Sequence, residues 1–214
     1  MDRRAVIVGA GGHARAVAGI LAQLKEIAVI GAVDKDRASI GEVVSPTGWR
    51  IIGSFEDLPA LRADGVTEAY LALGDNATRQ SRYEALETMG FALPPLIHPT
   101  AWLEEGVVIG AGSVLCARAI LGAQAAVGRG CIVNTGAIAD HETTIDDFAH
   151  LATGSRVAGR VRIGARSFIG IGSSVADNYT IGEGTVIGAG SVVVDHIPAG
   201  VVAYGTPARV ARHA

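Results

Sequence analysis

The stretch IGAGSVLCARAILGAQAAVGRGCIV, residues 109–133, returns to an aliphatic side chain at every sixth position. The same spacing extends from residue 97 to residue 193, where sixteen of seventeen such anchor positions are Ile, Leu or Val and one is Ala139. A period this regular indicates a structural repeat. The anchors are Ile97, Leu103, Ile109, Leu115, Leu121, Val127, Val133, Ala139, Ile145, Leu151, Val157, Ile163, Ile169, Val175, Ile181, Ile187 and Val193.

Each repeat is predicted to form one short strand and a bend. Six is a multiple of the two-residue period of a strand and not of 3.6, so the anchors share one face only on extended backbone. The position four after the anchor is mostly small, as the crowded inside of a corner requires, and stacked repeats of this kind bury an aliphatic column. We expect the glycines that follow seven anchors to supply the dihedral angles of the bend. They are Gly110, Gly122, Gly128, Gly164, Gly170, Gly182 and Gly188.

Ahead of the repeats, predicted strands alternate with helices. An apolar run over residues 3–9, a helical pattern over 12–24 and a strand over 27–33 form the start of a βαβ arrangement. A further strand is predicted over residues 68–74, and we expect the helix after it to be capped by Asn76. The N-terminal part is therefore predicted to be an α/β unit with a Rossmann-like, mostly parallel sheet.

Length and composition limit what the protein can be. The 214 residues fit two small domains, predicted at 1–95 for the α/β unit and 96–197 for the β-helix, with a C-terminal cap or tail over 198–214. A net charge of −3 and the lack of a basic run argue against nucleic acid or an anionic membrane as partner. We expect a cytoplasmic protein, since there is neither an 18-residue apolar run nor a signal-peptide pattern.

The first glycine loop, Gly9-Ala10-Gly11-Gly12-His13-Ala14, has the spacing of a phosphate-binding turn between a strand and a helix. Its glycines let a phosphate approach the backbone, and the helix start offers free N–H groups. The α/β unit is too short for both halves of a dinucleotide fold, so a mononucleotide or nucleotide-sugar fits better than NAD. A packing turn without ligand is the alternative, and His13 can either contact the ligand or help to cap the helix.

The Ala139 anchor opens the sequence Ala139-Asp140-His141-Glu142, the place where the repeat departs from its rule beside ionisable side chains. An imidazole can accept a proton, so His141 is a candidate to take one from an attacking amine, and an adjacent carboxylate would hold its tautomer. Contact between neighbouring strand residues requires a bend, because they face opposite ways. A solvated surface histidine is the alternative interpretation.

Neither the histidines nor the cysteines predict a metal site. His141 and His150 lack a third histidine at a spacing suited to zinc, which argues against a hexapeptide-fold carbonic anhydrase. Cys116 and Cys131 lie within the repeats, fifteen residues apart, and are predicted to be buried filler. We therefore expect no metal.

The hexads, with IGAGSV at 109–114 and IGAGSV again at 187–192, resemble those of the hexapeptide-repeat acyltransferases. This resemblance implies a left-handed parallel β-helix with three hexads in each coil. It also implies a homotrimer that binds acetyl-CoA in a groove between neighbouring subunits.

Combined with the glycine loop, the repeats make the whole chain similar to the sialic-acid O-acetyltransferase and PglD-like group of sugar acyltransferases. Within this group it most resembles the N-acetyltransferases of nucleotide-linked 4-amino-4,6-dideoxysugars. The resemblance favours GDP-perosamine as substrate and leaves a UDP-sugar open. It implies that the nucleotide-sugar is held by Gly11, Gly12, His13, Asp34, Lys35 and Gly74.

The same resemblance assigns roles in the solenoid. It implies that His141 and Glu142 form the catalytic pair, while Asn134 and His150 lie near the acetyl group and the thioester carbonyl. It places acetyl-CoA along His150, Gly159, Ile171 and Gly172.

The sequence thus favours an enzyme that transfers acetyl from acetyl-CoA to the sugar 4-amino group by direct attack in a ternary complex, with His141 as base or proton relay. The negative oxygen formed in this reaction would need a donor, either a backbone N–H or the Asn134 amide. Two alternatives stay open at this point: a sugar O-acetyltransferase and a non-catalytic assembly module. A nicotinamide oxidoreductase is disfavoured, because the second half of its fold is missing.

Overall fold

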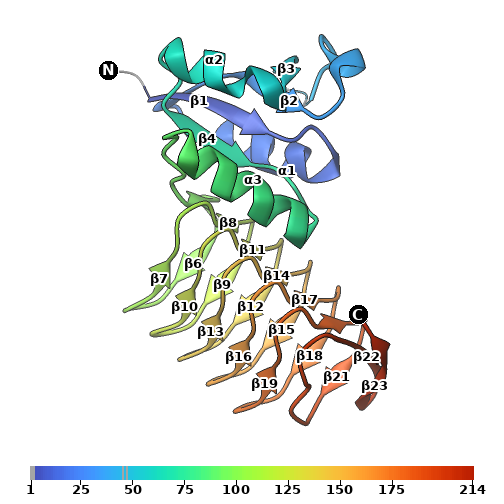
Figure 1. Ribbon diagram of the computed structural model, residues 1–214. Coiled ribbons are helices and arrows are strands. Elements are labelled where there is room, and N and C mark those ends of the chain that lie inside the picture. The colour runs from blue at the N-terminus through green and yellow to red at the C-terminus, as the bar shows by residue number, and fades with distance from the viewer. Residues whose placement is uncertain (1–2, 45, 47) are drawn as a thin grey trace. The chain divides into compact units, whose positions relative to one another are not determined.

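The computed structural model describes residues 3–44, 46 and 48–214 of the chain (Figure 1). Its internal contacts divide the protein into two compact units, Met1–Leu96 and Ile97–Ala214. None of the helices in the described part of the chain is long and apolar enough to cross a membrane.

The first unit is built on a four-stranded sheet with the order β3-β2-β1-β4, in which all neighbouring strands are parallel. The carboxyl ends of these strands meet at one edge, which is where α/β folds of this kind place their ligands. The strands are β1 (Arg3–Val8), β2 (Ile27–Asp34), β3 (Ile51–Ser54) and β4 (Glu68–Leu71). The helices are α1 (Gly12–Leu21), α2 (Leu58–Ala63) and α3 (Asn76–Thr88), with short 3₁₀ turns η1 (Arg37–Ser39) and η2 (Phe55–Asp57).

The predicted parallel α/β unit is confirmed, with three local differences. Helix α1 ends at Leu21, three residues before the predicted end at residue 24. Strand β4 ends at Leu71, so residues 72–74 form a loop at the sheet edge. The cap of α3 is Asp75 and not Asn76, because the Asp75 carboxylate accepts a hydrogen bond from the Thr78 backbone N–H at 2.8 Å. Asp and Asn are equally good caps, so the adjacent pair gave no way to choose between them.

The second unit is a solenoid of two-residue strands, β5 to β21, and each anchor is the second residue of its strand. Partners in neighbouring coils lie eighteen residues apart, as in Val127 beside Ile145, so three strands complete one coil. The strands are β5 (Leu96–Ile97), β6 (Trp102–Leu103), β7 (Val108–Ile109), β8 (Val114–Leu115), β9 (Ile120–Leu121), β10 (Ala126–Val127), β11 (Ile132–Val133), β12 (Ile138–Ala139), β13 (Thr144–Ile145), β14 (His150–Leu151), β15 (Arg156–Val157), β16 (Arg162–Ile163), β17 (Phe168–Ile169), β18 (Ser174–Val175), β19 (Thr180–Ile181), β20 (Val186–Ile187) and β21 (Val192–Val193). The β-helix predicted from the six-residue period is confirmed.

The anchors form the core of this solenoid. Every anchor from Leu115 to Val193 is at most 3% exposed, whereas Leu103 in the first coil is 36% exposed. Full burial of such a side chain is worth about 1.5–3 kcal/mol in transfer free energy. Because each anchor packs on those one coil above and below, this stabilisation extends along the whole stack.

The glycine that follows an anchor has a different role from the one predicted. These glycines lie outside the left-handed region of the backbone, and a Cβ on Gly110 would lie only 2.5 Å from the Gly128 carbonyl of the next coil. The residue with positive φ comes two positions later, as at Gly112 and Arg118. Glycine after the anchor is therefore required by close approach between coils and not by the bend itself.

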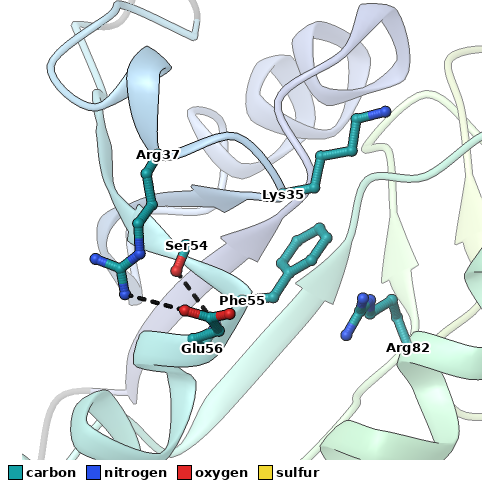
Figure 2. A pocket seen from close by; sticks show the side chains of 6 residues that line it. All are labelled: Lys35, Arg37, Ser54, Phe55, Glu56 and Arg82. Carbon is teal, nitrogen blue, oxygen red and sulfur yellow. Dashed lines mark hydrogen bonds and ion pairs between the residues drawn. The ribbon is translucent and has the colours of Figure 1, made fainter.

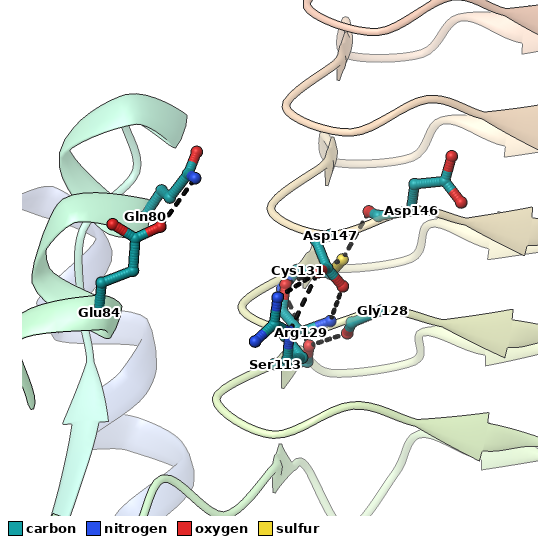
Figure 3. A network of polar contacts seen from close by, with 8 residues as sticks. All are labelled: Gln80, Glu84, Ser113, Gly128, Arg129, Cys131, Asp146 and Asp147. Carbon is teal, nitrogen blue, oxygen red and sulfur yellow. Dashed lines mark hydrogen bonds and ion pairs between the residues drawn. The ribbon is translucent and has the colours of Figure 1, made fainter. Parts of the chain in front are cut away.

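The small residues inside the corners also join one coil to the next. Ser113 donates a hydrogen bond from its hydroxyl to the Gly128 carbonyl at 2.7 Å and accepts one from the Cys131 N–H at 2.9 Å (Figure 3). On the outside of the same corner, Arg129 and Asp147 form an ion pair of 2.8 Å between successive coils (Figure 3). The buried hydroxyl of Ser113 is thus paired with backbone groups of the next coil.

The regular period ends after Val193, as the sequence predicts. Ile197 still pairs with Ile181, but the offset is no longer eighteen residues. Strand β22 (Val201–Gly205) then adds to β20 in parallel, and β23 (Ala208–His213) folds back against it in antiparallel fashion.

Candidate functional site

A cavity of about 400 Å³ opens at the carboxyl edge of the α/β sheet. It lies where the loops after β1, β2 and β4 come together with Phe55, the residue that follows β3, so residues from four parts of the chain share it. The structure brings together all six residues to which the resemblance assigned the nucleotide-sugar: Gly11, Gly12, His13, Asp34, Lys35 and Gly74.

Asp34 holds the glycine loop against the end of β2. One carboxylate oxygen accepts a hydrogen bond from the Ala10 N–H at 3.0 Å, and the other accepts one from the Lys35 N–H at 2.6 Å. Gly9, at the turn, has φ of +109°, and a Cβ there would lie 2.8 Å from the Leu73 side chain. The loop is therefore shaped before any ligand binds. Both Asp34 oxygens are already used by backbone N–H groups, which makes Asp34 an organiser of the cavity.

His13 is kept neutral by its surroundings. Burial, together with a smaller contribution from the nearby positive charge of Arg79, lowers the pKa of His13 to about 4. Its Nε2 atom is buried and has no hydrogen-bond partner among the described residues. A neutral imidazole that lines the cavity is thus available to donate or accept a hydrogen bond.

Arg79 is a functional candidate that the sequence did not reveal. Its side chain is fully buried, and its guanidinium donates to the carbonyls of Leu73 and Gly74, both at 3.1 Å, and to the Asn76 amide oxygen at 2.7 Å. It therefore fixes the loop after β4 that lines one side of the cavity. The acceptors are mostly backbone carbonyls, which leave no residue-type signal for a sequence analysis to detect.

In the solenoid, His141 and Glu142 contact each other directly. His141 Nδ1 lies 3.1 Å from Glu142 Oε2, and Glu142 adopts a left-handed backbone conformation with φ of +57°. This is the bend that contact between neighbouring residues requires. Both side chains are about half exposed, so the pair is open to a substrate.

Two further side chains extend this pair along the stack. Arg160 lies one coil after Glu142, and its Nη1 atom is 3.6 Å from Glu142 Oε2. Arg160 Nε in turn donates to the Asn178 amide oxygen at 2.8 Å. All three residues have positive φ and occupy the same corner at eighteen-residue spacing. The eighteen-residue spacing from Glu142 is the sequence signal from which Arg160 could have been found as a neighbour of the pair.

Gly159 provides the space in which the His141 ring lies. A Cβ on Gly159 would overlap the imidazole atoms Cε1 and Nε2 of His141. The resemblance assigned Gly159 to acetyl-CoA, whereas the geometry gives it a direct part in positioning the imidazole.

Asn134 and His150 form a second polar pair. The Asn134 amide oxygen accepts from the Thr135 N–H at 2.8 Å, which turns its Nδ2 toward His150 Nε2 at 3.2 Å. An amide N–H donates, so His150 Nε2 is the acceptor and the ring proton is on Nδ1. The His150 ring also makes an edge-to-face contact with Phe168, with ring centroids 5.0 Å apart.

The two polar pairs occupy different corners of the coil. Asn134, Ile171 and Gly172 follow strands of the sheet that contains β11, β14 and β17, whereas His141 and Glu142 follow β12 in another sheet. One chain therefore divides the predicted site residues of the solenoid between two corners. His141, Glu142 and Gly159 lie at one corner, and Asn134, His150, Ile171 and Gly172 lie at the other.

Neither cysteine lies in an activating environment. Cys116 and Cys131 are both buried, and burial raises the pKa of the Cys116 thiol to about 11. Within the described residues, no group of three or more His, Cys, Asp or Glu side chains is arranged to hold a metal ion.

Comparisons with known proteins match both units. Residues 4–86 match the PglD N-terminal domain, and residues 160–195 match the bacterial transferase hexapeptide repeat. The perosamine N-acetyltransferase PerB from Caulobacter crescentus, solved with CoA and GDP-perosamine, is 37% identical, with a TM-score of 0.91 over 97% of this chain and 96% of that one. Two other structures of that enzyme are of variants in which a single histidine is replaced.

A second relative extends the match. The acetyltransferase domain of PglB from Neisseria gonorrhoeae, solved with acetyl coenzyme A, is 35% identical, with a TM-score of 0.90 over 99% of this chain and all of that one. The chain belongs to the PglD-like hexapeptide-repeat sugar acetyltransferases. The solenoid is accordingly the left-handed parallel β-helix of this family. WeeI from Acinetobacter baumannii, 24% identical with a TM-score of 0.86, shares the fold.

Replacing Gly159 with alanine is expected to lower kcat/KM for acetyl transfer by about 10²-fold. The added methyl group would displace the His141 imidazole, and a shift of about 1 Å in a catalytic group can cost this much. Alanine fits the backbone here, since Gly159 lies outside the left-handed region. Steady-state kinetics measure the loss, and thermal unfolding checks that the fold is intact.

A double variant separates this effect from general damage. If Gly159 acts through His141, adding Gly159→Ala to His141→Ala lowers activity no further. A full additional loss in the double variant would contradict the assignment.

Proposed function

We propose that this protein transfers the acetyl group of acetyl-CoA to the 4-amino group of a nucleotide-linked 4-amino-4,6-dideoxysugar, with GDP-perosamine favoured. The observation that carries the proposal is the His141–Glu142 contact, in a chain 37% identical to an enzyme crystallised with CoA and GDP-perosamine. The cavity lined by the glycine loop, in the same chain, supports a nucleotide-linked acceptor in preference to a free sugar.

His141 acts as base or proton relay. Its Nδ1–H donates to Glu142, so Nε2 carries the lone pair that can accept a proton. The nitrogen of the sugar amine attacks the thioester carbonyl carbon, its proton passes to His141 Nε2, and the thiolate of CoA leaves. A positioned general base contributes about 10²- to 10⁴-fold to such a step.

Glu142 and Arg160 hold the base in place. The carboxylate fixes the orientation and tautomer of His141 and stabilises the imidazolium that forms. Arg160 limits the motion of that carboxylate from the next coil, at 3.6 Å. Glu142 is therefore a positioning residue for His141 in this proposal.

Asn134 is suited to stabilise negative charge on the thioester oxygen. One Nδ2 proton is directed at His150, and the amide has a second one to donate. His150 Nε2 is occupied as an acceptor, so His150 orients Asn134 and does not itself donate through that atom. A fixed donor of this kind is typically worth a few kcal/mol, in the range of about 2.7–4 kcal/mol in a dry site.

Acetyl-CoA supplies the reactive thioester, and the second corner fits such a ligand. Ile171 is an apolar side chain that is 57% exposed, and Gly172 beside it leaves the backbone open because nothing lies within 4 Å of a Cβ there. An exposed apolar side chain and accessible backbone suit the long, flexible arm of CoA.

The active form in this proposal is a homotrimer. Asn134 and His150 lie at a different corner from His141, so a complete site requires a neighbouring subunit to bring the two groups together. Sedimentation of the purified protein as a monomer at assay concentrations would contradict this part of the proposal.

The acetyl group passes directly from CoA to the sugar. An acyl-enzyme route would need a reactive nucleophile, whereas burial raises the pKa of the Cys116 thiol to about 11 and Cys131 is fully buried. Both substrates must therefore be bound together.

His141→Asn is expected to lower kcat/KM by about 10²- to 10⁴-fold near neutral pH, since the amide cannot accept the proton. The deficit should shrink at high pH, where hydroxide can take the proton in place of His141. His213→Asn, at an exposed position near the C-terminus, is the matched control and should retain full activity. A loss smaller than threefold for His141→Asn would exclude the role of base.

The reaction itself is tested by release of CoA thiol from acetyl-CoA with GDP-, UDP- and dTDP-linked 4-aminosugars, each beside its 4-hydroxy counterpart. We expect turnover with GDP-linked aminosugar and none with the hydroxy analogue. Turnover with the hydroxy compounds alone would indicate an O-acetyltransferase. Absence of release with every compound would leave the solenoid as a non-catalytic module.

A further inference from the structure

A second cavity, of about 390 Å³, adjoins the glycine-loop cavity in the α/β unit (Figure 2). The two cavities share Lys35 and Phe55, so a ligand anchored at the glycine loop can extend past Phe55 into the second one. The remaining lining residues of the second cavity are Arg37, Ser54, Glu56 and Arg82. The resemblance to known sugar acetyltransferases assigned none of these four, nor Phe55.

The second cavity has flat surfaces on which a nucleobase can stack. Phe55 is partly exposed, and its ring lies between Lys35 and Arg82 in Figure 2. The Arg82 guanidinium lies over the Phe55 ring, with Cζ 4.3 Å from the ring centroid. Aromatic rings and guanidinium groups are the side chains on which bases stack in proteins.

The charged side chains at the rim of the second cavity include one acceptor, Glu56, and several donors. Glu56 is exposed, and its only ion-pair partner among the described residues is Arg37, at a long 3.4 Å. Arg37 is held more closely by Asp57, at 3.0 Å. Glu56 therefore retains a carboxylate oxygen that can accept hydrogen bonds, while Lys35 and Arg82 supply donors.

We propose that this second cavity recognises the guanine base of the nucleotide-linked sugar, with Phe55 as stacking surface and Glu56 as the acceptor for guanine N1–H and the N2 amine. This inference rests on the proposed function, because it takes the diphosphate to lie at the glycine loop. Guanine presents two adjacent donors on one edge and the acceptors O6 and N7, which Lys and Arg contact. Uracil has one N–H donor between two carbonyls, and adenine lacks the N2 amine, so guanine fits this combination best.

The test uses the full-length protein and calorimetric titration with GDP, inosine diphosphate and UDP. Inosine diphosphate differs from GDP only in lacking the N2 amine. GDP should bind about tenfold more tightly than inosine diphosphate, as expected for one good paired contact to a base, and more tightly still than UDP.

Variants assign this preference to residues. Glu56→Gln should reduce the difference between GDP and inosine diphosphate to less than about threefold, whereas Glu87→Gln, the same change at an exposed position on α3, should leave it unchanged. Phe55→Leu should weaken the binding of GDP and of inosine diphosphate by similar factors, since stacking on the ring does not depend on the N2 amine.

Each result separates this inference from the proposed function. Equal binding of GDP and UDP, binding of none of the three, or an unchanged preference in Glu56→Gln would overturn the guanine site. If UDP-linked aminosugars alone are acetylated, the guanine site fails and acetyl transfer stands. If GDP binds as expected but no aminosugar releases CoA thiol, the guanine site stands and acetyl transfer fails.

Discussion

The structure of the solenoid depends on one register, in which each strand residue pairs with the residue eighteen positions later. The same backbone hydrogen bond recurs every eighteen residues. The Val108 N–H donates to the Ala125 carbonyl, and eighteen residues later the Ala126 N–H donates to the Thr143 carbonyl. Two-residue strands cannot be stable alone, so their stability comes from the coils above and below. The register therefore has to hold along the whole stack, and the candidate site residues of the solenoid take their positions from it.

The same register places residues eighteen positions apart directly above one another, so that they form a column along the solenoid. Glu142, Arg160 and Asn178 follow one another at a left-handed corner, and each contacts the next. Charged side chains on a surface usually contribute little when they pair in isolation. In a column they share a rigid support, so Glu142 can orient His141 without a buried second layer of residues. The cavity in the α/β unit follows another principle, in which loops at a sheet edge are fixed by Asp34 and Arg79.

Much of the fold could be predicted, because the aliphatic period and the strand–helix alternation are local signals. The six residues grouped around the glycine-loop cavity were also expected, and they come from three loops that a parallel sheet places at one edge. The sequence indicated only that His141 and Glu142 could touch if the backbone bends between them. Whether it bends could not be predicted, since positive φ at a glutamate has no signature in sequence. The glycine at Gly110 was expected to supply the dihedral angles of a bend, whereas it is required by the close approach of the next coil. The distance between coils depends on the tertiary structure and has no local signal in the sequence. Arg79 and the cavity around Phe55 were missed, as their partners are backbone carbonyls or distant residues.

Because the left-handed corners repeat at one-coil spacing, the solenoid has a natural unit of length. Losing or gaining eighteen residues would leave each remaining side chain on its own face. A change of six residues would carry His141 to another corner, and a change of one would turn an anchor such as Leu151 outward. In related proteins, insertions and deletions within the solenoid should therefore be whole coils, while the hairpin of β22 and β23 at its end remains free to vary.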